Sequence, residues 1–197
     1  AGYLAKKMGL PIDKLIVATN ENDILHRAIS KGDYVSKKVK ETLSPSMDIQ
    51  LASNFERLIY YVNNSDSSIT TDIMKKIKQN SYHIDKNNLE TIQQDFLSES
   101  CSEQETLDII KNNFKDNNII LDPHTAIGVG AANKLAINNC VVLSTAHPCK
   151  FPNATNNAID KHEKLPKDLQ YVLDKEENFQ VLKNDEEDVK NFVKSKA

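Results

Sequence analysis

The stretch LIVATNENDILHRAISKG, residues 15–32, decides the fold class, because a strand pattern and a helix pattern follow each other there. Residues 15–20 are a short apolar run that ends in polar side chains, which is typical of a buried strand. Asn22 can then cap a helix over residues 23–31, and Gly32 can end it. A strand followed by a capped helix is half of a β–α–β unit, so the sequence predicts an α/β fold with a mainly parallel sheet flanked by helices.

The chain begins with a helix pattern that has an end but no start. Small or apolar residues recur at helical spacing over residues 1–8, Gly9 suits the position after the helix, and Pro11 blocks its continuation. No capping residue comes before this helix, and the chain lacks an initiating Met. We therefore expect the chain to be a fragment of a longer protein or one product of a split gene.

The last third of the chain returns to α/β patterns. Residues 119–121 predict a strand, after which Asp122 can cap a helix that has Pro123 in its first turn. Gly128 and Gly130 each cost about 1 kcal/mol in a helix interior, so we expect close packing around them.

A further apolar run, CVVLS at residues 140–144, predicts another strand. Ligands of open α/β sheets bind outside the carboxyl ends of the strands, so Ser144 and Thr145 lie where a ligand would be met. We expect residues 15–19 and 140–144 to be neighbouring or near-neighbouring parallel strands, with Asn20 and Thr145 at the same edge of the sheet.

Composition divides the chain into three segments. Residues 1–64 and 116–197 are predicted to be α/β segments of one domain, the second of which ends in a charged helical tail. Between them, residues 65–115 contain charged amphipathic helix patterns separated by polar joints, which predicts a helical insertion on the surface. Two capping boxes are predicted, at Ser53–Glu56 and Ser102–Glu105.

Charge and composition exclude several classes of protein. The 197 residues carry 25 Lys and Arg against 28 Asp and Glu, which removes the electrostatic argument for binding nucleic acid or an anionic membrane surface. No run of about 18 apolar residues is present to span a bilayer. Three widely spaced cysteines indicate no disulfide framework, so we expect a cytoplasmic protein. The sequence has neither a P-loop nor a Gly-rich dinucleotide fingerprint.

Three polar clusters are candidates for chemistry. They follow the first strand (Asn20, Asn22, Asp23), begin a helix (Asp122, His124, Thr125) and follow the last strand (Ser144, Thr145, His147). Asn22 and Asp122 can equally be helix caps, and both histidines can be ordinary, partly buried side chains. Neither histidine pairs with a cysteine or carboxylate at ligand spacing, so we expect no metal site. A Cys149–His147 nucleophile is discounted, because a proline separates the two residues and no third group orients them.

Four strings in this sequence resemble, in the same order, the C-terminal half of the threonine synthase family. They are ATNENDIL at residues 18–25, TLSPSMDIQLASNFERL at 42–58, DPHTAIGV at 122–129 and LSTAHPCKFP at 143–152. The resemblance is to the longer branch of that family, found in bacteria and fungi. It implies the fold of pyridoxal 5′-phosphate (PLP) enzymes of fold type II, shared with the tryptophan synthase β subunit. It also implies a lyase that converts O-phosphohomoserine and water to L-threonine and phosphate.

The resemblance further implies roles for individual residues. Thr145 would hydrogen-bond the pyridine nitrogen of PLP, and Ser144 would lie beside the cofactor. The candidates for the substrate cleft are Asn20, Asn22, Asp23, Arg57, His124 and His147, and weaker candidates for its edge are Met47, Asp48 and Asn54. Arg57 could bind the substrate phosphate, and the equally weighted alternative is a surface arginine on a capped helix.

Two family features are missing from this sequence. The Schiff-base lysine of the family lies in a Ser-Phe-Lys-Asp string; Lys115 follows Phe114 and precedes Asp116, but Asn113 stands in place of the serine. The Gly- and Asn-bearing loop that holds the cofactor phosphate is expected immediately before Ala1. We therefore expect the catalytic lysine upstream, a missing N-terminal half as partner, and no activity of this chain alone. The alternatives are a threonine synthase-like phospholyase and a non-catalytic truncated remnant.

Overall fold

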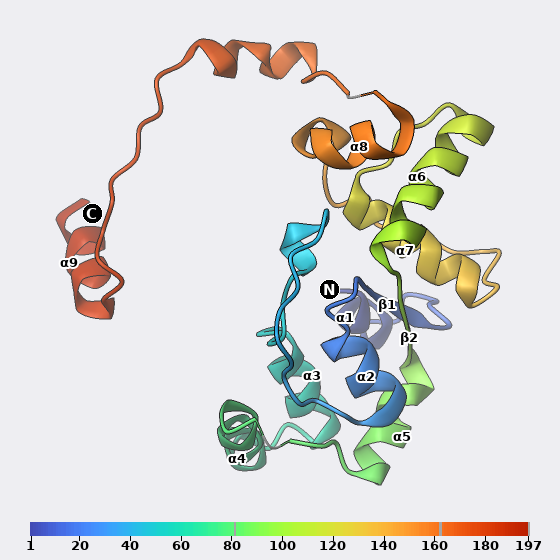
Figure 1. The fold of residues 1–197 in the computed structure, drawn as a ribbon. Helices are drawn as coiled ribbons and strands as arrows, with labels where there is room; N and C mark the ends of the chain where they lie inside the picture. Colours follow the sequence, from blue (N-terminus) through green and yellow to red (C-terminus); the bar gives the residue numbers. More distant parts are fainter. Residues whose placement is uncertain (81, 162, 197) are drawn as a thin grey trace. The chain divides into compact units, whose positions relative to one another are not determined.

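The computed structural model describes residues 1–80, 82–161 and 163–196. Contacts within the chain divide it into two compact units, Ala1–Glu163 and Lys164–Ala197. The first unit holds both apolar clusters and the sheet, whose two strands are labelled in Figure 1. All of the candidate site residues, the last of which is His147, belong to the first unit.

In the first unit, two short strands interrupt a series of helices along the chain. The first unit contains α1 (Gly2–Lys7), β1 (Leu15–Thr19), α2 (Ile24–Lys31), η1 (Pro45–Met47), α3 (Phe55–Val62), α4 (Ser67–Lys78), α5 (Lys86–Asp95), β2 (Phe96–Ser100), α6 (Glu103–Asn117), α7 (Pro123–Lys134), η2 (Pro148–Lys150) and α8 (Pro152–Ile159), where η marks a 3-10 helix. The second unit contains η3 (Lys167–Asp174) and α9 (Glu186–Lys196), in which no described residue is buried. Among the described helices, none is both long enough and apolar enough to cross a membrane.

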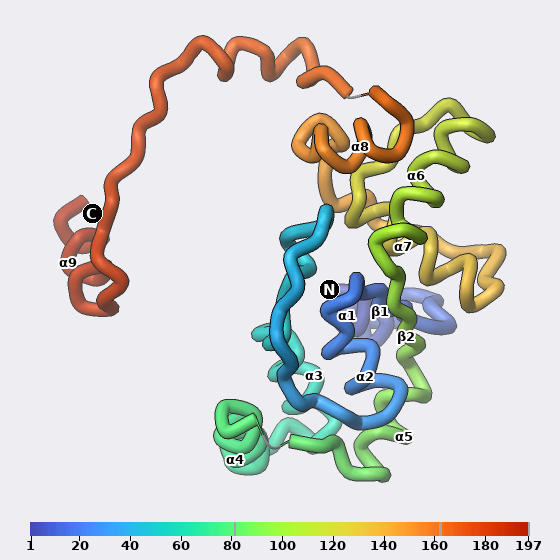
Figure 2. Tube along the Cα trace, viewed as in Figure 1, coloured from blue at the N-terminus to red at the C-terminus, as the bar shows by residue number. Residues whose placement is uncertain are grey.

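Strands β1 and β2 form a parallel pair whose register runs from Leu15 opposite Phe96 to Thr19 opposite Ser100. The ladder continues one step further, because the Cys101 amide donates to the Thr19 carbonyl at 2.9 Å. Parallel strands need a long crossover connection, which the segment from α2 to α5 supplies (Figure 2). The predicted first strand, the parallel direction of the sheet and the α/β class are confirmed, but the strand that pairs with β1 is not the predicted one.

Helix α2 follows β1 as predicted, but its start differs from the prediction. Gly32 ends the helix in the left-handed conformation, with φ of 74°, where the lack of a Cβ avoids a clash. Asp23 occupies the N-cap position, without a capping hydrogen bond from its side chain in the described structure. The Asn22 side chain instead accepts from the Lys40 amide at 2.9 Å, so the cap predicted at Asn22 is wrong.

Strand β2 lies inside residues 65–115, where the sequence pattern predicts only helices. Helix α5 ends at Asp95, and Phe96 adopts extended backbone with φ of −118° and ψ of 140°. Phe96 and Leu97 continue the apolar pattern of α5, which is why the pattern suggests a longer helix. Pairing with β1 gives these backbone groups hydrogen-bond partners. The helix pattern is therefore wrong at residues 96 and 97, and the helical insertion with its boundaries stays a prediction.

Residues 138–147 contain no helix or strand, so the strand predicted over residues 140–144 is wrong for this chain. Its apolar side chains are uncovered: Val141 is 90% and Leu143 is 75% exposed. A strand exists through hydrogen bonds to a neighbouring strand, and no described segment supplies one to these residues. The strand predicted over residues 119–121 is absent for the same reason. Asn20 and Thr145 consequently do not share an edge of one sheet.

Helices α6 and α7 start as predicted, whereas α3 does not. The Asp122 carboxylate accepts from the first amides of α7, and Pro123 lies in its first turn. At α6, Ser102–Glu105 forms a complete capping box. The capping box predicted at Ser53–Glu56 is wrong, because Asn54 is the N-cap residue of α3 and no capping hydrogen bond from its side chain is found in the described part of the chain.

The two glycines of α7 allow close packing, as predicted. A Cβ on Gly130 would lie 2.6 Å from both Cys101 Sγ and Ile109 Cδ1. A Cβ on Gly128 would lie 2.9 Å from Val142 Cγ1. These contacts bring α7 against the residue that follows β2 and against α6, which offsets the low helix propensity of glycine.

Two apolar clusters hold the first unit together. One joins α2, α3, α4 and α5 around Ile24, Ile59 and Ile92. The other joins α6, α7 and α8 around Ile110. Leu43, from the loop that follows α2, packs against the second cluster and so brings that loop to the start of α7 and α8.

Candidate functional site

Two amide side chains that follow β1 lie in a buried hydrogen-bond network around one carboxylate. We call it the Asp48 network, and its members are Asn20, Asn22, Thr42, Ser44 and Asp48. The Asn20 Nδ2 atom lies 2.7 Å from Asp48 Oδ1 and 2.9 Å from the hydroxyls of Thr42 and Ser44. Asn22 Nδ2 lies 3.0 Å from the same carboxylate oxygen. Asp48 Oδ2 accepts from the Thr42 amide at 2.8 Å.

The Asp48 network fixes the loop over residues 39–48 against the carboxyl end of β1. Asn20 Oδ1 accepts from the Asn22 amide at 2.8 Å, which closes a short turn. Asn22 Nδ2 donates to the Lys40 carbonyl at 2.9 Å, and its oxygen accepts from the Lys40 amide. Because both buried amides are satisfied within the chain, Asn20 and Asn22 position this loop rather than present a free group.

Asp23 is held by Arg27, a buried cation one helical turn further on. Arg27 Nε lies 2.9 Å from Asp23 Oδ1, its Nη1 contacts Asp33, and its Nη2 donates to the Val35 carbonyl at 2.8 Å. Burial by itself raises the pKa of Asp23, but the hydrogen bond and charge of Arg27 outweigh it and lower that pKa. Burial also lowers the pKa of Arg27, and the two carboxylates raise it more strongly. Asp23 is therefore part of an ion-pair cluster.

His124 lies in the first turn of α7, with one ring nitrogen anchored and the other without a partner. Its Nδ1 lies 3.0 Å from Asp122 Oδ1, and its ring centroid lies 4.7 Å from that of Phe151. His124 Nε2 is buried without a hydrogen-bond partner among the described residues, as is the Thr19 hydroxyl at the carboxyl end of β1. An unpaired buried polar atom costs about 1–3 kcal/mol, so both atoms mark places where a ligand or another protein segment can supply a partner.

The remaining candidates are exposed. Ser144, Thr145 and His147 lie in the irregular segment before η2, and within the described residues the Thr145 side chain makes no hydrogen bond. His147 Nδ1 accepts from the Cys149 amide at 3.2 Å and so caps η2. Arg57 is exposed on α3, which agrees with the alternative interpretation of this residue as a surface arginine.

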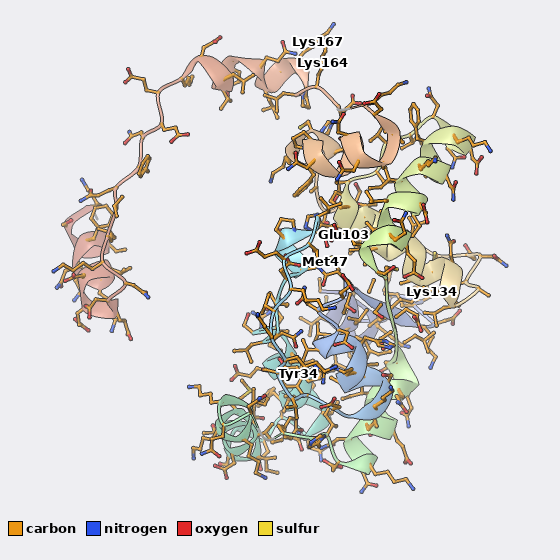
Figure 3. All side chains as sticks on the ribbon, viewed as in Figure 1. Tyr34, Met47, Glu103, Lys134, Lys164 and Lys167 are labelled. Atoms are coloured by element: carbon orange, nitrogen blue, oxygen red, sulfur yellow. The ribbon has the colours of Figure 1, made fainter. Side chains whose placement is uncertain are left out.

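A small hollow opens at the carboxyl end of β1. Its lining residues come from three segments: Asn20 after β1, Thr42, Leu43 and Ser44 in the loop, and Glu103 and Thr106 in α6. Figure 3 marks this region by Met47, in η1, and Glu103, at the start of α6. The ranges that the structure describes contain no group of three or more His, Cys, Asp and Glu side chains that could hold a metal ion.

The structure brings only part of the predicted set together. Asn20, Asn22 and Asp48 meet in the Asp48 network, with Asp48 at its centre rather than at a cleft edge. Sequence reasoning missed Thr42 and Ser44, although the run of small polar residues in TLSPS is a signal that could have found them. It also missed Arg27, for which no local pattern distinguishes a buried arginine from an exposed one.

The chain is similar to known proteins of one family. The family model described as "Threonine synthase, C-terminal" matches residues 125–193. The threonine synthase of Saccharomyces cerevisiae is 40% identical, over 98% of this chain and 43% of that protein. The crystal structure of PLP-bound threonine synthase from Brucella melitensis has a TM-score of 0.86 and 38% identity, and covers 98% of this chain and 42% of that one. This chain is similar to the C-terminal part of threonine synthases over nearly its whole length.

The resemblance carried by the four sequence strings is thus confirmed, and so is the fold of the PLP-dependent threonine synthases. The chain spans less than half the length of these threonine synthases. Human threonine synthase-like 1 is similar as well, with 38% identity over 81% of this chain and 22% of that protein.

Proposed function

We propose that this chain is the C-terminal part of a cytoplasmic threonine synthase, a PLP-dependent carbon–oxygen lyase that converts O-phosphohomoserine and water to L-threonine and phosphate. The observation that carries the proposal is the 98% coverage of this chain by threonine synthases, at a TM-score of 0.86 for the structure from Brucella melitensis. In this proposal the N-terminal part of the protein supplies the Schiff-base lysine and the loop for the cofactor phosphate.

The residues of this chain fit such a cofactor. When bound, PLP supplies an electron sink for carbanion chemistry on the amino-acid substrate. Thr145 offers a hydroxyl that no described residue uses, and two buried polar atoms, Thr19 Oγ1 and His124 Nε2, lack partners among the described residues. A neutral hydroxyl can hydrogen-bond the pyridine nitrogen without holding it protonated, as a carboxylate would, and so moderates how strongly the ring withdraws electrons.

Other residues of the chain would shape the substrate side of the site. Ser144 would lie beside the cofactor, while Arg57 and His147, which are both exposed, would face the substrate. An arginine suits a phosphate because its planar donors form two parallel hydrogen bonds with the oxygens. The Asp48 network holds the loop over residues 39–48, which would form the rim of this site.

The exposure of the apolar side chains of Val141 and Leu143 supports the proposal that another part of the protein covers residues 140–144. Burial of a valine or leucine side chain stabilises a protein by about 1.5–3 kcal/mol. The relatives that match this chain are more than twice its length, so their remaining N-terminal part is the source of cover that we propose.

The test joins residues 1–197 to the N-terminal part of the yeast relative and measures threonine formed from O-phosphohomoserine. We expect the joined protein to bind PLP covalently and to release threonine and phosphate, and residues 1–197 alone to hold no covalently bound PLP and to release no phosphate. Circular dichroism shows whether the joined protein folds. If it folds but binds no PLP, the proposal is contradicted and the remaining alternative is a non-catalytic truncated remnant.

The second candidate function is a threonine synthase-like phospholyase. The similarity to human threonine synthase-like 1 favours it. Product analysis separates the two, because a threonine synthase yields threonine from O-phosphohomoserine and the phospholyase yields 2-oxobutyrate.

Substitution of Thr145 in the joined protein tests the cofactor contact. Thr145→Val keeps the shape and removes the hydroxyl, so the pyridine nitrogen loses its partner. Leaving a buried polar group unpaired costs about 1–3 kcal/mol, so turnover should fall by roughly ten- to a hundred-fold. Thr145→Ser retains the hydroxyl and should have a mild effect. Unchanged turnover and PLP affinity in Thr145→Val would remove Thr145 from the site.

A further inference from the structure

We infer that His124 Nε2 binds a phosphate oxyanion and that Asp122 positions the imidazole ring for this contact. The inference rests on the proposed function for the source of the phosphate, which is the substrate or the cofactor. No single step of that function depends on it.

The anchored nitrogen fixes both the direction and the chemistry of the ring. A carboxylate only accepts hydrogen bonds, so Asp122 Oδ1, 3.0 Å from Nδ1, keeps the proton on Nδ1. Nε2 is then the ring nitrogen left to contact a ligand. Asp122 is itself immobile, since its carboxylate accepts from the amides of His124 and Thr125 and from the Thr125 hydroxyl.

The free nitrogen is withheld from solvent as well as from protein partners. The His124 side chain is 7% exposed and that of Asp122 is 1% exposed. Native proteins rarely leave such an atom unpaired, because it has lost its hydrogen bonds to water without replacement. A bound ligand that hydrogen-bonds to Nε2, accepting from it when the ring is protonated, would restore the missing hydrogen bond.

The apolar cluster around Ile110 connects His124 to the loop of the Asp48 network through Phe151 and Leu43. The His124 ring packs on Phe151, with 58° between the two ring planes. Phe151 and Leu43 both pack against the cluster around Ile110. Leu43 in turn lines the hollow at the carboxyl end of β1, where α/β proteins bind ligands.

An oxyanion is the ligand that this arrangement suits best. The first amides of α7 already donate to Asp122, so the helix offers a ligand the imidazole rather than backbone N–H groups. The Asp122 carboxylate offsets the positive end of the helix dipole, which would otherwise disfavour an imidazolium. A protonated Nε2 can then make a charge-assisted hydrogen bond to a phosphate oxygen.

Nuclear magnetic resonance of the imidazole nitrogens in the 197-residue chain tests this contact with inorganic phosphate as the probe. Phosphate should shift the His124 Nε2 signal in a saturable manner. His83, whose side chain is 68% exposed, is the internal reference and should shift little. O-phosphohomoserine and PLP in separate titrations identify the source of the phosphate by which of them shifts Nε2 at lower concentration. An Nε2 signal that responds to none of the three overturns the inference.

Three variants complete the test. His124→Gln should weaken phosphate binding by roughly ten- to a hundred-fold, and the control His83→Gln by less than about twofold. Asp122→Asn keeps a residue that caps helices well but removes the charge, so phosphate binding should require a lower pH. An unchanged pH profile in Asp122→Asn overturns its positioning role. Because these measurements use no turnover, their failure is distinguishable from failure of the threonine assay.

Discussion

Replacing Gly130 with alanine tests the close contact between α7, α6 and the residue after β2. The new Cβ would lie 2.6 Å from Cys101 Sγ and from Ile109 Cδ1, well inside the roughly 3.5–4.0 Å of an optimal contact. Such overpacking costs about 1–3 kcal/mol, whereas alanine in place of glycine stabilises a helix interior by about 1 kcal/mol. The free energy of unfolding should therefore fall by about 0–2 kcal/mol.

Gly128→Ala is the matched control in the same helix. Its Cβ would meet only Val142 Cγ1, at 2.9 Å, in a segment that has no regular structure and can shift. This variant should keep most of the helix gain of about 1 kcal/mol. The two variants should thus differ in stability by about 1–3 kcal/mol, with Gly130→Ala the weaker.

Urea unfolding of the 197-residue chain, followed by circular dichroism, measures this difference. The midpoint of Gly130→Ala should lie below that of Gly128→Ala, with the slope unchanged. Adding Ile109→Val to Gly130→Ala removes one of the two clashing atoms, so the pair should be more stable than the sum of its single effects. Equal or reversed midpoints would refute the packing argument.

Two further predictions concern charged side chains. Arg27→Met should lower the free energy of unfolding by about 3 kcal/mol in urea denaturation, because it leaves two carboxylates without their cation; Arg57→Met, at an exposed position, should change it by less than about 0.5 kcal/mol, and equal losses would contradict the role of Arg27. The hydrogen bond from Lys134, with that from the Ser102 amide, lowers the pKa of Glu105 to about 2, so its contribution is complete above the unfolded value of 4.5 and is lost as the pH falls through about 2. Since Glu105 is partly exposed, its contribution is about 0.2–1 kcal/mol. In unfolding curves between pH 5 and pH 2, this fall in stability should be absent from Glu105→Gln and present in the control Glu103→Gln.

Local signals in the sequence predicted the starts and ends of several elements. Asp122 with Pro123, the box at Ser102–Glu105, and Gly32 each act within one or two turns of helix, so the chain around them is sufficient to identify them. The same holds for β1, a compact apolar run. The glycines of α7 could be interpreted because a residue that disfavours helix must be offset by packing.

Features that depend on distant partners were not predictable in this way. Phe96 continues the pattern of α5, and only β1, some eighty residues away, makes it a strand. Arg27 is buried because Asp33 and the Val35 carbonyl fold back onto it. The Asp48 network likewise joins residues that lie more than twenty positions apart, so its members could be suspected as polar but not assembled.

The wrong strand over residues 140–144 and the unpaired nitrogen of His124 have a common physical cause. Backbone N–H and C=O groups need partners just as a buried imidazole does, and in both cases the described residues supply none. The strand pattern is a property of the side chains, which are apolar and β-branched, whereas the strand itself is a property of two segments. Under the proposed function, a second protein body would pair residues 140–144 and a phosphate ligand would pair His124 Nε2. The two local features that this chain leaves incomplete would then be completed by different partners, which is why the NMR titration of His124 and the assay of the joined protein are independent tests.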